Sequence, residues 1–208
     1  MLRVVGVDPG LSRCGVGVVE GSAARARVLR VGVVRTPPGL ATPQRLALLH
    51  DELRAVLAAS QADAVAVERV FFNSNVSTGI GVAQAAGVVL LCATQAGLPV
   101  AEYSPNEVKM AVAGNGDAGK GQVGYMVRVL LGLAEAPRPA DAADALAVAL
   151  CHLQAAARGA GRSGSAAAAG DAGGGMSARL AAALAASTGP GAGVVRRARR
   201  TGAPEARR

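Results

Sequence analysis

The stretch Arg3-Val-Val-Gly-Val-Asp-Pro-Gly10 decides the fold of this chain. Its three valines are apolar and β-branched, so they predict a strand that is buried on both faces. Pro9-Gly10 predicts a turn directly after Asp8, and a second apolar run at residues 14–19 predicts the return strand of a hairpin. Asp8 would therefore stand at the end of a rigid strand, where it either bonds the amides of its own turn or binds a cation.

Further apolar runs predict three more strands and a series of helices. The strands are expected at residues 26–35, 63–68 and 98–102. Helices are expected at residues 42–60, 76–96, 122–133 and 140–157, and a further helix is expected after the capping box that Ser104 opens. Thr42 is expected to be the N-cap of the first helix, and a flexible loop is expected at residues 115–121. Three strands followed by alternating helices and strands predict an α/β fold, with a five-stranded mixed sheet and helices on both faces.

The expected helix at 76–96 is apolar almost all the way round. A helix of this kind is covered on more than one side. One side would pack on the chain's own sheet and the other on a partner subunit, with Val89 on the outward face. The sequence therefore predicts a homodimer built on residues 76–96.

Composition narrows the class of protein. The 208 residues are 51% hydrophobic but only 2% aromatic, so valine, leucine and alanine must form the core. The three cysteines lack ligand spacing, which argues against disulfides and structural zinc. No signal peptide is expected, since Asp8 falls where its apolar segment would lie. No apolar run is long enough to span a bilayer. A cytoplasmic protein with no membrane partner is expected.

The last fifty residues differ in composition from the rest. Residues 159–208 are rich in Gly, Ala, Ser and Arg, and eight arginines against two carboxylates give them +6 of the net charge of +8. So few large apolar side chains can scarcely support a packed core. We expect a folded domain at residues 1–158 and a disordered basic tail at 159–208, whose charge suits a polyanionic partner.

Four carboxylates stand out by their positions. Asp8 and Glu68 end two strands that the expected topology places side by side, and Asp141 and Asp144 share one helix face. Singly, each has an ordinary explanation: a favourable helix dipole for the pair, and an ion pair with Arg69 for Glu68. Together they suit hard divalent cations, which prefer oxygen ligands. Two such ions about 4 Å apart promote phosphodiester hydrolysis.

The order and spacing of four motifs over residues 1–157 resemble the RuvC family of Holliday junction resolvases. The motifs are Gly6-Val-Asp8-Pro-Gly10, Val67-Glu68-Arg-Val-Phe71, Gln84-Ala-Ala-Gly87 and Asp141-Ala-Ala-Asp144-Ala-Leu-Ala147. The resemblance implies an RNase H-like fold, and it implies that Asp8, Glu68, Asp141 and Asp144 are catalytic residues that bind Mg²⁺, for which Mn²⁺ could substitute. It further implies a homodimer that nicks two strands of a four-way DNA junction and works with the RuvA–RuvB branch-migration complex.

Three other residues are candidates for DNA contact. Phe71 and its neighbour are the only phenylalanines, and an aromatic pair next to a metal site can stack on unpaired bases, although it could equally cover the core. The resemblance favours Phe71. Lys109 and Lys120 are the only lysines, and the family pattern places lysines there for phosphate contact. Ala86 departs from the pattern, because many members carry arginine at that position.

Two other classes of protein compete with a nuclease. Residues 8–15 are also similar to the phosphate-binding hairpin of actin-like proteins and sugar kinases, but that class needs two similar domains and this chain is short for them. A non-catalytic DNA-binding protein could act through the arginine-rich tail alone. An RNase H-like enzyme with another substrate also remains open, because a fold does not fix a substrate.

Overall fold

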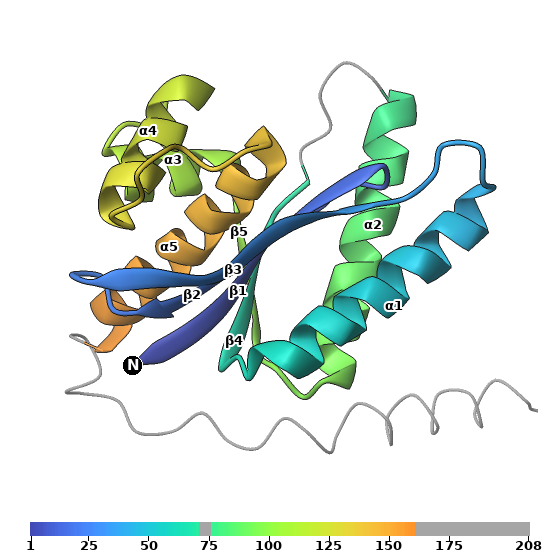
Figure 1. Cartoon of the computed structure of the whole chain (residues 1–208), viewed down its shortest axis with the longest axis horizontal. Coiled ribbons are helices and arrows are strands. Elements are labelled where there is room, and N and C mark those ends of the chain that lie inside the picture. Colours follow the sequence, from blue (N-terminus) through green and yellow to red (C-terminus); the bar gives the residue numbers. More distant parts are fainter. Residues whose placement is uncertain (71–75, 161–208) are drawn as a thin grey trace, which may run out of the picture. The chain divides into compact units, whose positions relative to one another are not determined.

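The computed structural model describes residues 1–70 and 76–160. In this part of the chain five strands form one sheet in the order β3-β2-β1-β4-β5 (Figure 1). The strands are β1 (Leu2–Asp8), β2 (Arg13–Gly21), β3 (Ala26–Arg35), β4 (Ala64–Glu68) and β5 (Val100–Tyr103). The helices are α1 (Thr42–Ser60), α2 (Val76–Gln95), α3 (Pro105–Ala113), α4 (Lys120–Leu130) and α5 (Ala140–Ala160).

The predicted five-stranded mixed sheet is confirmed. β1, β2 and β3 form an antiparallel meander, whereas β4 runs parallel to β1 and β5 runs parallel to β4. β1 is central and its four residues 4–7 are buried, as its valines predict. Because β1 and β4 are parallel neighbours, their carboxyl ends meet at one edge of the sheet.

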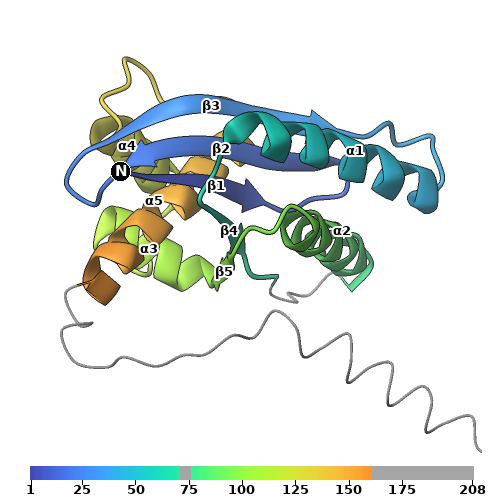
Figure 2. The ribbon, with the colours of Figure 1, turned by 90° about the horizontal axis from the view of Figure 1, so that it is seen from below.

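Helices cover both faces of the sheet (Figure 2). Val5 and Val7 point into the core that α1 and α2 close, while Val4 points into the core that α3, α4 and α5 close. This alternation is the two-residue period of a strand, applied to a strand that is apolar on both sides. The two cores are built almost entirely from aliphatic side chains, as the composition requires.

Glycines in the first two strands let α5 lie directly on the sheet. A Cβ at Gly15 would overlap the carbonyl of Asp141, and one at Gly6 would overlap the carbonyl of Ala145. A Cβ at Gly17 would lie 2.7 Å from a methyl group of Leu146. The backbones of helix and sheet therefore approach more closely than side chains would allow. This packing fixes where α5 begins, next to the ends of β1 and β4.

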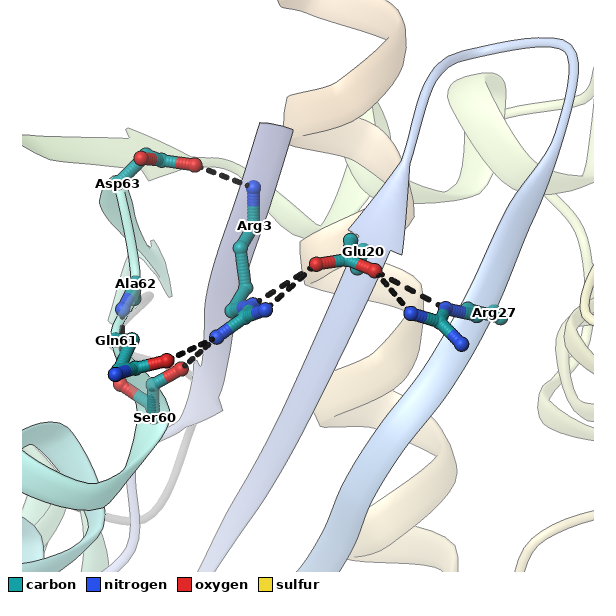
Figure 3. Close-up of polar contacts among 7 residues, drawn as sticks. All are labelled: Arg3, Glu20, Arg27, Ser60, Gln61, Ala62 and Asp63. Atoms are coloured by element: carbon teal, nitrogen blue, oxygen red, sulfur yellow. Dashed lines mark hydrogen bonds and ion pairs between the residues drawn. The ribbon is translucent and has the colours of Figure 1, made fainter. Parts of the chain in front are cut away.

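An ion-pair network links the strands at the end of the sheet opposite Asp8 and Glu68 (Figure 3). The Glu20 carboxylate accepts hydrogen bonds from the guanidinium groups of Arg3, at 2.7 Å, and Arg27, at 2.6 Å. Arg3 also donates to the carbonyl of Ser60 at 2.9 Å, and its backbone N–H donates to Asp63 at 2.7 Å. The network joins the three antiparallel strands to the connection between α1 and β4.

Three expected helix boundaries move in the structure. The N-cap of α1 is Ala41 instead of Thr42, because the Gln44 side chain accepts a hydrogen bond from the Ala41 N–H. α4 begins at Lys120, inside the expected loop, since the carbonyl of Gly119 accepts the first helical bonds. It ends at Leu130, before the predicted residue 133, because Gly132 adopts a φ of 63° and the bonds around it close the helix.

The prediction that Val89 lies on the outward face of α2 is wrong. Val89 is 2% exposed and belongs to the core under α1, whereas Leu91 and Ile80 are 50% and 51% exposed. α5 extends to Ala160, past the expected end of the helix at 157 and past residue 159, where the tail was expected to begin. Residues 161–208 lie outside the described residues. No helix in the part of the chain that the structure describes is long and apolar enough to cross a membrane.

Candidate active site

Asp8 and Glu68 meet at one edge of the sheet, as expected. Val7 pairs with Val67 across β1 and β4, so the next residue on each strand is a carboxylate. Burial, followed by repulsion from Glu68, Asp144 and Asp141, raises the pKa of Asp8 to about 8. Burial and repulsion from Asp144 also raise the pKa of Glu68. Two anions fixed in this way favour a cation between them.

Asp141 and Asp144 enter from the first turns of α5. Their charges act on Asp8, so both helical carboxylates lie within electrostatic range of the strand-end pair. Each of the two also faces a cation of the chain. Arg13 Nε lies 3.3 Å from Asp141 Oδ2, and Lys120 Nζ lies 3.8 Å from Asp144 Oδ2. Burial raises the pKa of Asp144, against the opposing charge of Lys120.

The ordinary explanation for Glu68 does not hold. Among the described residues Glu68 forms no ion pair, and the Arg69 guanidinium donates instead to the carbonyl of Glu102 at 3.4 Å. Glu68 is thus a half-buried carboxylate held at a strand end without a cation of its own. Such a group is available to a ligand.

The two lysines lie near this acidic group. Lys109 on α3 and Lys120 at the start of α4 are close enough for their charges to lower the pKa of Glu68, although burial has the larger, opposite effect. Lys120 is 86% exposed and can reach solvent-borne ligands. Phe71, the third candidate for DNA contact, lies outside the described residues.

Sequence analysis missed two arginines that share a cleft with Asp8. The cleft has a volume of about 560 Å³, and Asp8, Ser12, Arg13, Arg45 and Asp141 are among its lining residues. Arg13 could have been suspected, because it follows the Pro9-Gly10 turn. Arg45 could not, since it lies on α1 and only the fold brings it to the turn.

Neither histidine belongs to the site. His152 Nδ1 lies 2.9 Å from the hydroxyl of Tyr103, and His50 Nδ1 lies 3.0 Å from a carboxylate oxygen of Asp51. Both histidines therefore have partners away from the carboxylates. Ala86 is buried on α2, at 8% exposure.

The donor chemistry of the four carboxylates fits a hard divalent cation. Only oxygen ligands are offered, and the pKa of Asp8 is raised by burial and by neighbouring negative charge, both of which a bound cation would offset. Among the described residues, however, no three acidic, His or Cys side chains converge closely enough to form a finished ligand set. Asp141 and Asp144 would have to turn away from Arg13 and Lys120 to complete one.

The mixed sheet carries carboxylates at the ends of two central strands, and the helix that crosses these strands carries two more. This arrangement is typical of nucleases of the RNase H-like class. The family model for crossover junction endodeoxyribonuclease RuvC matches residues 4–152. This chain belongs to the RuvC family. Nucleases of this family are metal-dependent. The family assignment decides against both the sugar-kinase alternative and the non-catalytic one.

Individual relatives agree with this assignment. The chain is 58% identical over 153 residues to the RuvC crossover junction endodeoxyribonuclease of Frankia alni, covering 73% of this chain and 78% of the relative. It is 55% identical to that of Frankia casuarinae, covering 73% and 89%. The solved structure of Thermus thermophilus RuvC in complex with a Holliday junction substrate has a TM-score of 0.73 at 44% identity, covering 76% of this chain and 97% of that one.

Proposed function

We propose that this protein resolves four-way DNA junctions in recombination and repair by Mg²⁺-dependent hydrolysis at Asp8, Glu68, Asp141 and Asp144. The observation that supports the proposal is that β1 and β4 end side by side at Asp8 and Glu68, while the start of α5, which carries Asp141 and Asp144, packs on Gly15, the residue paired with Asp8. The Thermus thermophilus relative was solved on a Holliday junction, which supports the choice of substrate.

The carboxylates differ in how firmly the fold holds them. Asp8 and Glu68 are fixed by the paired ends of β1 and β4, while Asp141 and Asp144 project from a helix and would exchange Arg13 and Lys120 for a bound metal. When bound, two Mg²⁺ ions would supply an activated water and positive charge for the scissile phosphate. The rigid pair defines the place of the reaction, and the helical pair completes the site.

The residues around the carboxylates would hold the DNA. Lys109 and Lys120 lie close enough to Glu68 to contact phosphates that flank the reacting one. Phe71, three residues after Glu68 in the sequence, is the proposed residue for stacking on an unpaired base at the junction centre.

A junction resolvase must cut two strands, which calls for two active sites. We assign the homodimer interface to α2, whose exposed face carries Ile80 and Leu91. Cooperation with a RuvA–RuvB branch-migration complex is the further partner that the family implies. We place the protein in the cytoplasm, where chromosomal junctions are accessible.

Substitution of Asp8 tests the proposal. Asp8→Asn keeps the shape of the side chain but removes charge that the metal needs, so it should abolish Mg²⁺-dependent cleavage of a labelled four-way junction and leave junction binding intact. Asp51→Asn is the matched control, because it removes a carboxylate that is 77% exposed on α1. Cleavage by Asp8→Asn at a near-normal rate would reject the assignment.

Metal removal tests the chemistry separately from the residues. Chelation of divalent ions should stop cleavage by the unaltered protein, and Mg²⁺ should restore it. Junction cleavage that persists after chelation would contradict a metal-dependent site. A four-way junction and a linear duplex of the same sequence should be compared, since preference for the junction separates a resolvase from a general RNase H-like enzyme.

A further inference from the structure

Arg45 has a neutral set of partners that hold it in one place. Its Nε donates to Thr36 Oγ1 at 2.8 Å, and one terminal nitrogen donates to Ser12 Oγ at 2.6 Å. Thr36 is only 4% exposed, and its hydroxyl donates in turn to the carbonyl of Leu11 at 2.6 Å. The guanidinium is therefore fixed by the β1–β2 turn and by the residue that follows β3.

The charge of Arg45 is not matched by an acid. In the ranges 1–70 and 76–160 no carboxylate lies within ion-pair distance of it, whereas Arg13 pairs with Asp141. Arg45 also stands in the first turn of α1, which contains no acidic residue. The helix dipole disfavours a cation at that end, so an anion beside Arg45 would relieve the arrangement.

The cleft that Arg45 lines also contains Asp8 and Asp141. A fixed cation and a group of carboxylates thus share one space of about 560 Å³. The two terminal nitrogens of a guanidinium can bind a phosphate in a bidentate manner, and among residues 1–70 and 76–160 only one of them has a hydrogen-bond partner. A DNA strand whose scissile phosphate lies at the carboxylates would bring a neighbouring phosphate within the same cleft.

We propose that Arg45 is a substrate-binding residue that binds a backbone phosphate of the strand to be cut. This phosphate is a neighbour of the scissile phosphate. Ser12 and Thr36 are positioning residues, because they act only by holding the guanidinium. This inference rests on the proposed nuclease function and adds to it a cation on the α1 side of the cleft, away from the lysines of α3 and α4.

The test measures binding of a fluorescent four-way DNA junction in chelator, where no cleavage occurs. Arg45→Gln should weaken binding about tenfold, as expected for a charged hydrogen bond that is lost. The slope of log K against log[salt] should become shallower by about 0.9, the value for one phosphate contact. Arg54→Gln, which removes the same charge from an exposed position on α1, should change neither quantity appreciably.

Two further variants separate phosphate binding from a structural role. Arg45→Lys keeps the charge and should keep the salt slope while losing part of the affinity. Ser12→Ala keeps Arg45 but loosens it, and should lower affinity a few-fold without changing the slope. If Arg45→Gln does not fold, these two variants decide: wild-type affinity in both overturns the proposal. A lower melting temperature for Arg45→Gln with an unchanged salt slope overturns it as well.

Inorganic phosphate serves as the competing ligand. If it raises the melting temperature of the unaltered protein but not of Arg45→Gln, while junction affinity is equal in the two, the site binds free phosphate and the proposal of a DNA contact is overturned. Because these measurements need neither metal nor cleavage, their outcome is independent of whether Asp8→Asn abolishes hydrolysis.

Discussion

Two carboxylates at opposite ends of the sheet illustrate how surroundings decide the role of a residue. Glu20 accepts hydrogen bonds from Arg3 and Arg27, and these bonds lower its pKa. Asp8 is buried among other acids, and its pKa is raised to about 8. The first carboxylate stabilises the folded chain, whereas the second needs a ligand. Sequence position alone distinguishes them only partly, because both stand at the ends of apolar strands.

The Glu20 network predicts a pH-dependent contribution to stability. Since the folded state lowers the pKa of Glu20, its stabilisation is fully present above the ordinary glutamate pKa of 4.5 and is lost as the pH falls through the lower folded value. Glu20→Gln should therefore lower the melting temperature at pH 7, and the difference from the unaltered protein should shrink in acid.

Thermal unfolding followed by circular dichroism at several pH values measures this effect. Glu52→Gln is the control, because Glu52 is exposed on α1 and should change the melting temperature little at any of these pH values. A deficit of Glu20→Gln that stays constant down to pH 3 would show that its shape and packing matter, and not its charge.

At the scale of elements, local sequence determined most of the fold. Valine-rich runs and turn residues predicted all five strands and the strand neighbours that bring Asp8 to Glu68. The Ser104 capping box predicted the start of α3. Contacts between residues that are distant in the sequence could not be predicted from local patterns. The start of α4 at Lys120 was hidden by glycines on both sides, and the inward direction of Val89 depends on how α2 is rotated against the sheet. The place of Arg45 depends on contacts with Ser12 and Thr36.

The close approach of α5 to the sheet predicts that Gly15 cannot be replaced without moving the site. Gly15→Ala places a methyl group against the carbonyl of Asp141, so it should destabilise the protein by about 1–3 kcal/mol. It should also reduce cleavage, because displacement of α5 moves two of the proposed metal ligands. Denaturant unfolding gives the first quantity and junction cleavage gives the second.

Gly32→Ala on β3 is the matched control for Gly15→Ala. A Cβ at Gly32 meets no atom within 4 Å, so this change should leave both stability and cleavage close to those of the unaltered protein. Equal effects of the two substitutions would mean that strand propensity, and not the contact with α5, determines the result.

At the scale of the whole molecule, the exposed face of α2 carries two large apolar side chains, Ile80 and Leu91, that the rest of the described chain leaves about half exposed. Leu91→Glu should yield monomers by light scattering and abolish paired nicking, because it places a charge in the proposed interface. Leu48→Glu on α1, which is also exposed at 42%, should leave the oligomeric state unchanged. Val89→Glu should instead unfold the protein, since Val89 is buried in the core.

Light scattering of the unaltered protein gives the first check on the dimer. A mass of one subunit would remove the basis for this interface. A dimer that survives Leu91→Glu would place the interface on another surface.

Residues 161–208 carry +6 of the net charge of +8, and their deletion separates charge from shape in DNA binding. The deletion removes eight arginines and two carboxylates but none of the proposed site residues. Fold and cleavage chemistry should therefore persist. If three or four of the arginines contact phosphates, the slope of log K against log[salt] should become shallower by roughly three units.

Affinity for a junction and for a linear duplex should fall alike after this deletion, since phosphate contacts carry no information about the sequence or branching of the DNA. Preference for the junction should consequently persist or rise. Binding of both substrates over a series of salt concentrations measures slope and preference together. An unchanged slope would show that these arginines do not engage DNA, and DNA binding would then rest wholly on residues 1–160, including the Arg45 contact proposed above.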